Sequence, residues 1–134
     1  MTQQEITLRV PGKREYALVL RLALGGVAVL KDLDAGALDD LRNASDEAVD
    51  CLLHQGREVS WLTLYVLDGG EKLTVCFTAE LAPGAVSGHA DEEETEISRA
   101  VLETLVPVVT LEAADCGCIR RIGLTLPKAV RMGA

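Results

Sequence analysis

The turn Asp68-Gly69-Gly70 constrains the fold of this chain more than any other stretch of its sequence. It joins two extended runs of residues, 58–67 and 71–79. Because glycine accepts the positive φ angles of a tight hairpin turn, these runs are predicted to pair as antiparallel strands. A sheet built around this hairpin is expected to be mainly antiparallel.

The rest of the chain supplies a further strand, three helices and a second hairpin. The predicted elements are a strand at 5–10, helices at 13–30, from Asp32 or Asp34 to Gln55 and at 93–105, and strands at 108–114 and 119–126. This order predicts an α/β (α+β) two-layer sandwich, with a mixed, mainly antiparallel sheet of about five strands and three helices on one face. A chain of 134 residues is expected to form a single domain, 1–134.

The helix at 13–30 is unusually apolar. Apolar residues cover most of its circumference, so it is expected to be largely buried. Arg21 is a charge in the middle of this helix, and such a residue either extends to the surface or pairs with an acid. The pair Gly25-Gly26 predicts a bend or a close approach of another segment to the backbone.

Charge and composition exclude several classes of partner. The chain has 13 Lys and Arg against 21 Asp and Glu, a net charge of −8. Nucleic-acid binding requires clustered basic residues, so no DNA or RNA contact is expected, and the acidic chain instead suits a basic protein partner. The opening residues show no secretory signal, and the apolar run 17–30 is too short and interrupted to span a bilayer. We therefore expect a cytoplasmic protein with reduced thiols and no membrane contact.

The second helix contains the sequence Asp46-Glu47-Ala48-Val49-Asp50-Cys51-Leu52-Leu53-His54. It resembles the motif S-E-A-V-x-N-A-x-x-H of the GHKL (histidine-kinase-like) ATPase fold, in its anti-sigma-factor serine-kinase branch. The order of elements is similar to that branch over nearly the whole chain. The resemblance implies a domain with a nucleotide site beside the second helix.

Two positions of this motif determine what the site can do. In the family, the Glu found here as Glu47 acts as general base near the γ-phosphate. The family Asn whose oxygen helps to hold Mg²⁺ is replaced by Cys51. Mg²⁺ prefers hard oxygen ligands, so this thiol is predicted to weaken metal-dependent ATP binding.

Two further family motifs are altered. When the motif D-x-G-x-G is laid on the third strand, Ala79 takes the place of the Asp that binds adenine, and Leu81 that of a Gly. The glycine turn that cradles phosphates corresponds to residues 92–98, which contain no glycine and four glutamates. Several carboxylates at this helix start are predicted to repel a triphosphate.

The resemblance therefore implies an anti-sigma-factor-like regulatory protein, which binds a sigma factor or an anti-sigma antagonist without productive ATP binding. No metal or cofactor is expected. The alternative is a divergent ATP-dependent serine/threonine protein kinase that uses ATP and Mg²⁺, with Glu47 as its base. A third hypothesis is a structural subunit that pairs with an intact kinase.

Three residues are candidates for contact with a protein partner. Trp61 and Tyr65 lie on one side of a strand, and aromatic residues are enriched at interfaces, so a homodimer or partner contact is expected there. Arg21 is similar in position to an Arg with which the anti-sigma branch grips protein partners.

The stretch Cys116-Gly117-Cys118 is interpreted as a hairpin turn, because one C-x-C supplies too few ligands for zinc.

Overall fold

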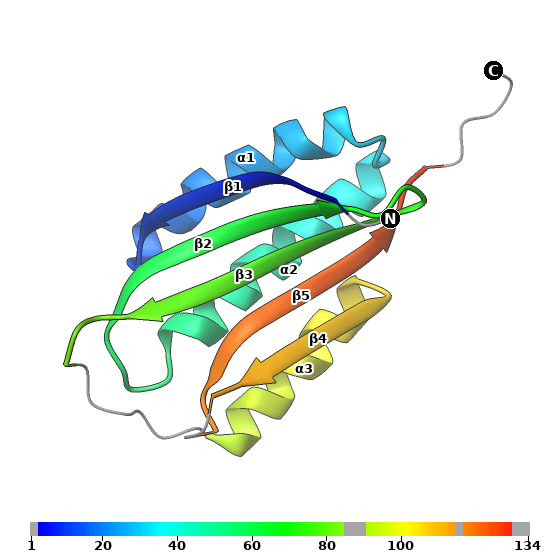
Figure 1. The fold of residues 1–134 in the computed structure, drawn as a ribbon. Coiled ribbons are helices and arrows are strands. Elements are labelled where there is room, and N and C mark those ends of the chain that lie inside the picture. The colour runs from blue at the N-terminus through cyan, green and yellow to red at the C-terminus, as the bar shows by residue number, and fades with distance from the viewer. Residues whose placement is uncertain (1–2, 85–90, 115–116, 130–134) are drawn as a thin grey trace, which may run out of the picture.

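The computed structural model describes residues 3–84, 91–114 and 117–129. In these ranges the elements follow the order predicted from the sequence (Figure 1). They are β1 (Gln3–Pro11), the 3₁₀ turn η1 (Arg14–Tyr16), α1 (Ala17–Leu30), α2 (Ala35–Leu53), β2 (Val59–Asp68), β3 (Lys72–Leu81), α3 (Glu92–Leu105), β4 (Val108–Ala113) and β5 (Ile119–Pro127). The irregular loop predicted after β3 includes residues 85–90, which lie outside the described residues.

The five strands form one sheet in the order β1-β2-β3-β5-β4. Neighbouring strands are antiparallel throughout the described part of the sheet, including the hairpin of β2 and β3. Gly70 takes a positive φ of 88° in the turn of that hairpin, as the sequence predicts. All three helices lie behind one face of the sheet (Figure 1), so the predicted two-layer sandwich is confirmed.

The core lies between the helices and the inner face of the sheet. Alternate residues of β2 point inward, and Leu62, Leu64 and Val66 are almost completely buried. Helix α2 packs between α1 and α3 and also contacts β3 and β5, so most of one side of it is buried. Because this side is made of Leu, Val, Ala, Ser and Cys, the helix can approach the sheet closely.

The prediction that the first helix is largely buried is wrong. Leu18, Leu22, Val29 and Leu30 of α1 keep 60%, 66%, 77% and 73% of their surface exposed. Helix α1 lies at one end of the helical layer, behind the edge strand β1 and next to α2, so only one of its faces is covered (Figure 1). In the described ranges, no helix is both long enough and apolar enough to cross a membrane.

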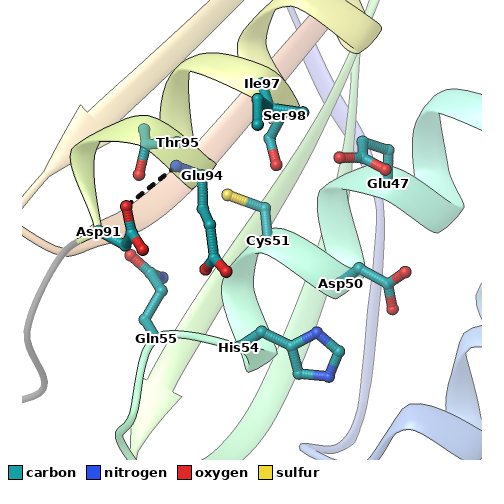
Figure 2. A pocket seen from close by; sticks show the side chains of 10 residues that line it. All are labelled: Glu47, Asp50, Cys51, His54, Gln55, Asp91, Glu94, Thr95, Ile97 and Ser98. Atoms are coloured by element: carbon teal, nitrogen blue, oxygen red, sulfur yellow. Dashed lines mark hydrogen bonds between the residues drawn. The ribbon is translucent and has the colours of Figure 1, made fainter.

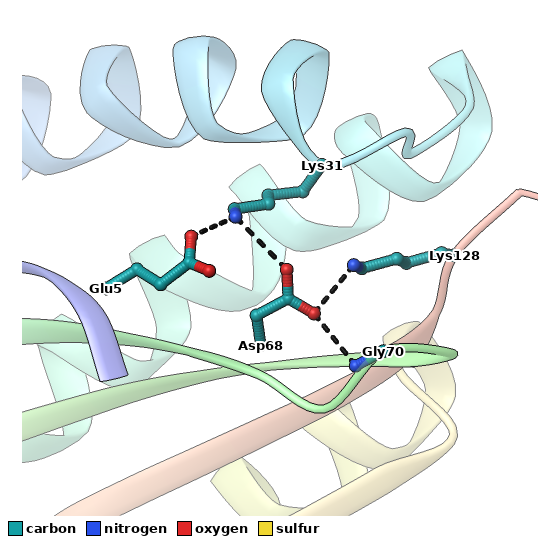
Figure 3. Close-up of polar contacts among 5 residues, drawn as sticks. All are labelled: Glu5, Lys31, Asp68, Gly70 and Lys128. Carbon is teal, nitrogen blue, oxygen red and sulfur yellow. Dashed lines mark hydrogen bonds and ion pairs between the residues drawn. The ribbon is translucent and has the colours of Figure 1, made fainter. Parts of the chain in front are cut away.

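A polar cluster joins four segments at one end of the sheet (Figure 3). The Asp68 carboxylate accepts hydrogen bonds from Lys128 Nζ at 2.6 Å, Lys31 Nζ at 3.1 Å and the Gly70 N–H at 2.9 Å. Lys31 also pairs with Glu5 of β1. Lys128 and the other two donors hold the pKa of the Asp68 carboxyl well below its ordinary value.

This cluster should make folding stability fall in acid. An unfolded Asp titrates near pH 4, and the folded Asp68 has the lower pKa. Asp68 therefore contributes stability above about pH 4 and loses that contribution as the pH falls below it. Urea unfolding of Asp68→Asn at pH 7, 4 and 3 should show lower stability at pH 7 and a shallower loss in acid.

Glu103→Gln provides the control, because Glu103 is an exposed carboxylate on α3. It should reproduce the pH profile of the unmodified chain. An Asp68→Asn profile parallel to that of the unmodified chain would contradict the role given to the cluster.

Candidate functional site

A pocket of about 480 Å³ lies between the C-terminal half of α2 and the first turns of α3. It is lined by Glu47, Asp50, Cys51, His54, Gln55, Asp91, Glu94, Thr95, Ile97 and Ser98 (Figure 2). The fold therefore brings together two stretches that lie some 40 residues apart in the sequence. These are the motif of the second helix and the acidic stretch that the sequence analysis aligned with the glycine turn of the GHKL fold.

Helical periodicity explains how α2 contributes to the pocket. Glu47, Cys51 and His54 recur at steps of four and three residues, so they lie on one side of the helix. Cys51 lies at the border of the buried side, and His54 is the exposed C-cap residue. Asp50 also lines the pocket. Its carboxylate oxygen Oδ1 lies 3.4 Å from Nε of Arg14, which is not among the described residues that line the pocket.

Asp91 caps α3 at the mouth of the pocket. Its carboxylate accepts hydrogen bonds from the backbone N–H groups of Glu93 at 3.0 Å and Glu94 at 3.1 Å. Glu92, Glu93 and Glu94 fill the first turn, where negative charge interacts favourably with the helix dipole. The free N–H groups with which a helix start binds an anion are therefore partly occupied by the chain's own carboxylate.

The lining of the pocket is acidic. Four of its members are carboxylates, namely Glu47, Asp50, Asp91 and Glu94. None of the described residues that line it is Lys or Arg. Sequence reasoning singled out Glu47 and the acidic helix start but missed Asp50, whose place in the pocket depends on how α2 and α3 pack.

Cys51 faces α3 from the buried side of α2, and only 9% of its surface is exposed. Burial raises the pKa of its thiol above the ordinary value, against the smaller lowering effect of a hydrogen bond with Ser98. The neutral thiol is a poor metal ligand. Among the described residues, no group of three or more His, Cys, Asp or Glu side chains is arranged to hold a metal ion.

Ala79 and Leu81 lie near the end of β3 and are not among the described residues that line the pocket. Ala79 packs against the core, while Leu81 is exposed and pairs with Val59 of β2. The apolar core contact of Ala79 explains why a small apolar residue fits that position.

The three predicted partner-binding residues do not share one surface. Arg21 lies in the helical layer and forms an ion pair with Asp46 of α2, which is one of the two arrangements expected from the sequence. Trp61 and Tyr65 lie on the opposite, uncovered face of the sheet. The guanidinium of Arg9 lies 4.2 Å from the centre of the Trp61 ring.

A buried polar contact missed by the sequence analysis anchors the end of the pocket. The Gln55 amide donates to the Ile119 carbonyl at 2.8 Å and accepts from the Ile119 N–H at 2.6 Å. Arg57 donates to the same carbonyl. These bonds join the segment that follows α2 to the first residue of β5, a contact that the sequence could not reveal because Gln55 and Ile119 are 64 positions apart.

The predicted turn before β5 is partly described. Gly117 has a φ of 86°, and its N–H donates to the Ala114 carbonyl at 2.9 Å. Cys118 is buried, whereas Cys116 lies outside the described residues. Gly117 thus supplies the positive φ that the turn needs.

Comparison with solved structures supports the fold. The chain is similar to the crystal structure of the RsbU and RsbW domains of Rv1364c from Mycobacterium tuberculosis, with a TM-score of 0.67 and 15% sequence identity. The similarity covers 97% of this chain and 35% of that one, so the chain spans about a third of its neighbour's length. No protein-family model matches the sequence, and no curated protein matches it.

The position of Cys51 predicts low thiol reactivity. Iodoacetamide modifies the thiolate, so labelling of Cys51 should be slow at pH 7 and rise only above the ordinary thiol pKa of about 8.5. Peptide mass spectrometry measures the rate at this one residue. The same peptide in urea-unfolded chain provides the reference, and equal rates in folded and unfolded chains at pH 7 would contradict the burial.

Proposed function

We propose that this chain is a regulatory protein of the anti-sigma-factor type that binds a protein partner and does not bind ATP productively. The partner is a sigma factor or an anti-sigma antagonist. The observation that carries the proposal is the acidic lining of the pocket, which combines four carboxylates with a capped helix start.

Electrostatics favours a cation over a nucleotide in this pocket. Two like unit charges 4 Å apart repel by about 4 kcal/mol at an effective dielectric constant of about 20. A triphosphate beside Glu47 and Glu94 would meet several such repulsions, and none of the described lining residues is a lysine or arginine that would offset them. With Cys51 in place of the family's Asn, these residues do not fit Mg·ATP, and we assign the chain no phosphoryl transfer.

The same charges suit a basic segment of a partner. Lysine or arginine side chains from such a segment would be attracted to the pocket, and the net charge of −8 would steer their approach. The fold is similar to that of the RsbU and RsbW domains, which agrees with the resemblance of the second-helix motif to the anti-sigma branch. Arg21, and separately Trp61 and Tyr65, are proposed as further partner contacts.

The runner-up function is a divergent serine/threonine kinase. One observation favours it: Glu47, the residue at the position of the family's general base, lines the pocket and is partly exposed. Saturable binding of Mg·ATP, with phosphate transfer that Glu47→Ala abolishes, would select this alternative and overturn the first proposal.

Charge removal in the pocket tests the electrostatic argument directly. Inorganic tripolyphosphate is titrated by calorimetry into the unmodified chain and into Asp50→Asn/Glu94→Gln. The unmodified chain should show no saturable binding at micromolar concentrations. The variant should show saturable binding, with a dissociation constant at least about tenfold below the highest concentration tested on the unmodified chain, a change of about 1.4 kcal/mol or more.

The matched control Glu103→Gln/Glu112→Gln removes the same charge at exposed positions outside the pocket. It should behave like the unmodified chain. Equal gains in the two variants would show that net charge, and not the pocket, excludes the phosphate.

Charge reversal tests the partner site. The tagged chain captures its partner from lysate of the source cell, and mass spectrometry identifies the protein retained. Glu47→Lys/Glu94→Lys should abolish capture, whereas Glu103→Lys/Glu112→Lys should retain it, because only the first pair lines the pocket. Capture should also weaken as salt rises.

Retention of the same partner by the Glu47→Lys/Glu94→Lys variant would place the binding surface elsewhere. The variants Arg21→Ala and Trp61→Ala/Tyr65→Ala, assayed in parallel, then show whether either of those surfaces is required.

A further inference from the structure

Helix α3 carries apolar residues on its open side, next to the pocket. Ala100 and Val101 follow Ile97 by three and four residues, so the three side chains share one side of the helix. Ile97 is 58% exposed, Val101 is 38% exposed, and Ala100 is exposed as well. Leu102 is the one buried residue of α3, all of which the structure describes. We call Ile97, Ala100 and Val101 the α3 patch.

The α3 patch and the pocket form one continuous surface. Helices α2 and α3 pack against each other and run in opposite directions (Figure 1). Ile97 lines the pocket, as does Glu47 of α2 (Figure 2). Asp40 is exposed seven residues before Glu47, so it lies on the same side of α2, two turns farther along. The side of α2 that faces the pocket therefore continues alongside the α3 patch.

Carboxylates border the α3 patch on both helices. Asp40 and Glu47 lie on the α2 side, while Glu93 and Glu96 are exposed on α3. Nε of Arg99 lies 3.6 Å from Oε1 of Glu96 and partly balances its charge. Asp40, Glu47 and Glu93 therefore supply most of the negative charge at the borders. The surface is apolar along its middle and acidic along its edges.

This pattern is complementary to an amphipathic basic helix. Apolar side chains three and four residues apart on such a helix would cover Ile97 and Val101, and its flanking lysines or arginines would reach the carboxylates. Helix α3 has 14 residues and is about 21 Å long, so a helical segment of about 15 residues matches its length. A second copy of α3 is a poor match, because its own Glu93 and Glu96 would meet like charges.

We infer that the segment received by the pocket is an amphipathic α-helix, which the α3 patch anchors through apolar contacts and the acidic borders orient through its basic side chains. The inference rests on the function proposed above for the pocket. It adds two requirements, apolar anchors and a helical conformation, because an acidic pocket alone would accept any basic segment. Removing Ile97 and Val101 from water supplies the part of the affinity that does not depend on charge.

Three synthetic peptides of about 15 residues and equal charge test the inference. The first is a Lys- and Leu-containing helix with its leucines at i, i+3, i+4 and i+7, so that they form one face. The second has the same composition with its leucines spread around the helix, and the third is the first peptide with a central proline. Calorimetry at physiological ionic strength should show that the unmodified chain binds the first peptide at least about tenfold more tightly than the other two. Difference circular dichroism should show that this peptide becomes helical when it binds.

Ile97→Gln/Val101→Gln removes the anchors without changing the charge. Both side chains are exposed, so the variant should keep the unfolding midpoint of the unmodified chain. Its affinity for the first peptide should fall at least about tenfold, and its affinity for the second should stay the same. Leu81→Gln/Val108→Gln is the matched control, since it replaces two exposed apolar residues outside this surface and should behave like the unmodified chain.

Equal affinity for the first and second peptides, or no effect of Ile97→Gln/Val101→Gln, would overturn the inference. Glu47→Gln/Glu94→Gln then separates it from the function proposed above. If that variant weakens binding of all three peptides, the acidic pocket still receives a basic segment without a helical anchor; if it weakens none, both proposals fail. A light-scattering mass that falls in Ile97→Gln/Val101→Gln would show that a second copy covers the α3 patch, and this would also overturn the inference.

Discussion

The arrangement of this molecule depends on the packing of α2 against the centre of the sheet. Helix α2 contacts α1 on one side, α3 on the other and the strands β3 and β5 behind it. Its buried side is apolar apart from Ser45 and ends at Cys51 and Leu52. Once that side is buried, Glu47 must point toward the gap beside α3, and the acidic start of α3 must close the gap. Hydrophobic packing thus fixes where the charges meet.

The charges in turn determine the chemistry that the pocket allows. The start of α3 is stable because Asp91 and the glutamates of the first turn interact with its N–H groups and its dipole. Asp91 occupies backbone N–H groups that a bound phosphate would need as hydrogen-bond donors, and the carboxylates at this helix start would repel the phosphate. A fold similar to that of the RsbU and RsbW domains here carries an acidic pocket, which we propose receives a basic side chain. The exposed apolar residues of α1 lie apart from that pocket.

Local patterns in the sequence were sufficient to predict the elements and their layers. The turn at Gly70, the alternation in β2 and the three- and four-residue steps in α2 each follow from backbone geometry. The exposure of α1 could not be predicted, because a sequence that is apolar around the whole helix does not indicate whether that helix lies in the middle or at the edge of a layer. The pocket was foreseen in part: Glu47 and the α3 start were identified, whereas Asp50 and Gln55 depend on contacts between distant segments.

The central claim is that the pocket between α2 and α3 repels phosphate and receives a basic segment. The most direct test is a backbone amide NMR titration of the isotope-labelled chain, first with Mg·ATP and then with the basic segment of the identified partner. The account predicts that Mg·ATP leaves the amides of residues 47–55 and 91–98 unchanged at millimolar concentration and that the partner segment shifts them. Saturable shifts of these amides with Mg·ATP, and none with the partner segment, would contradict it.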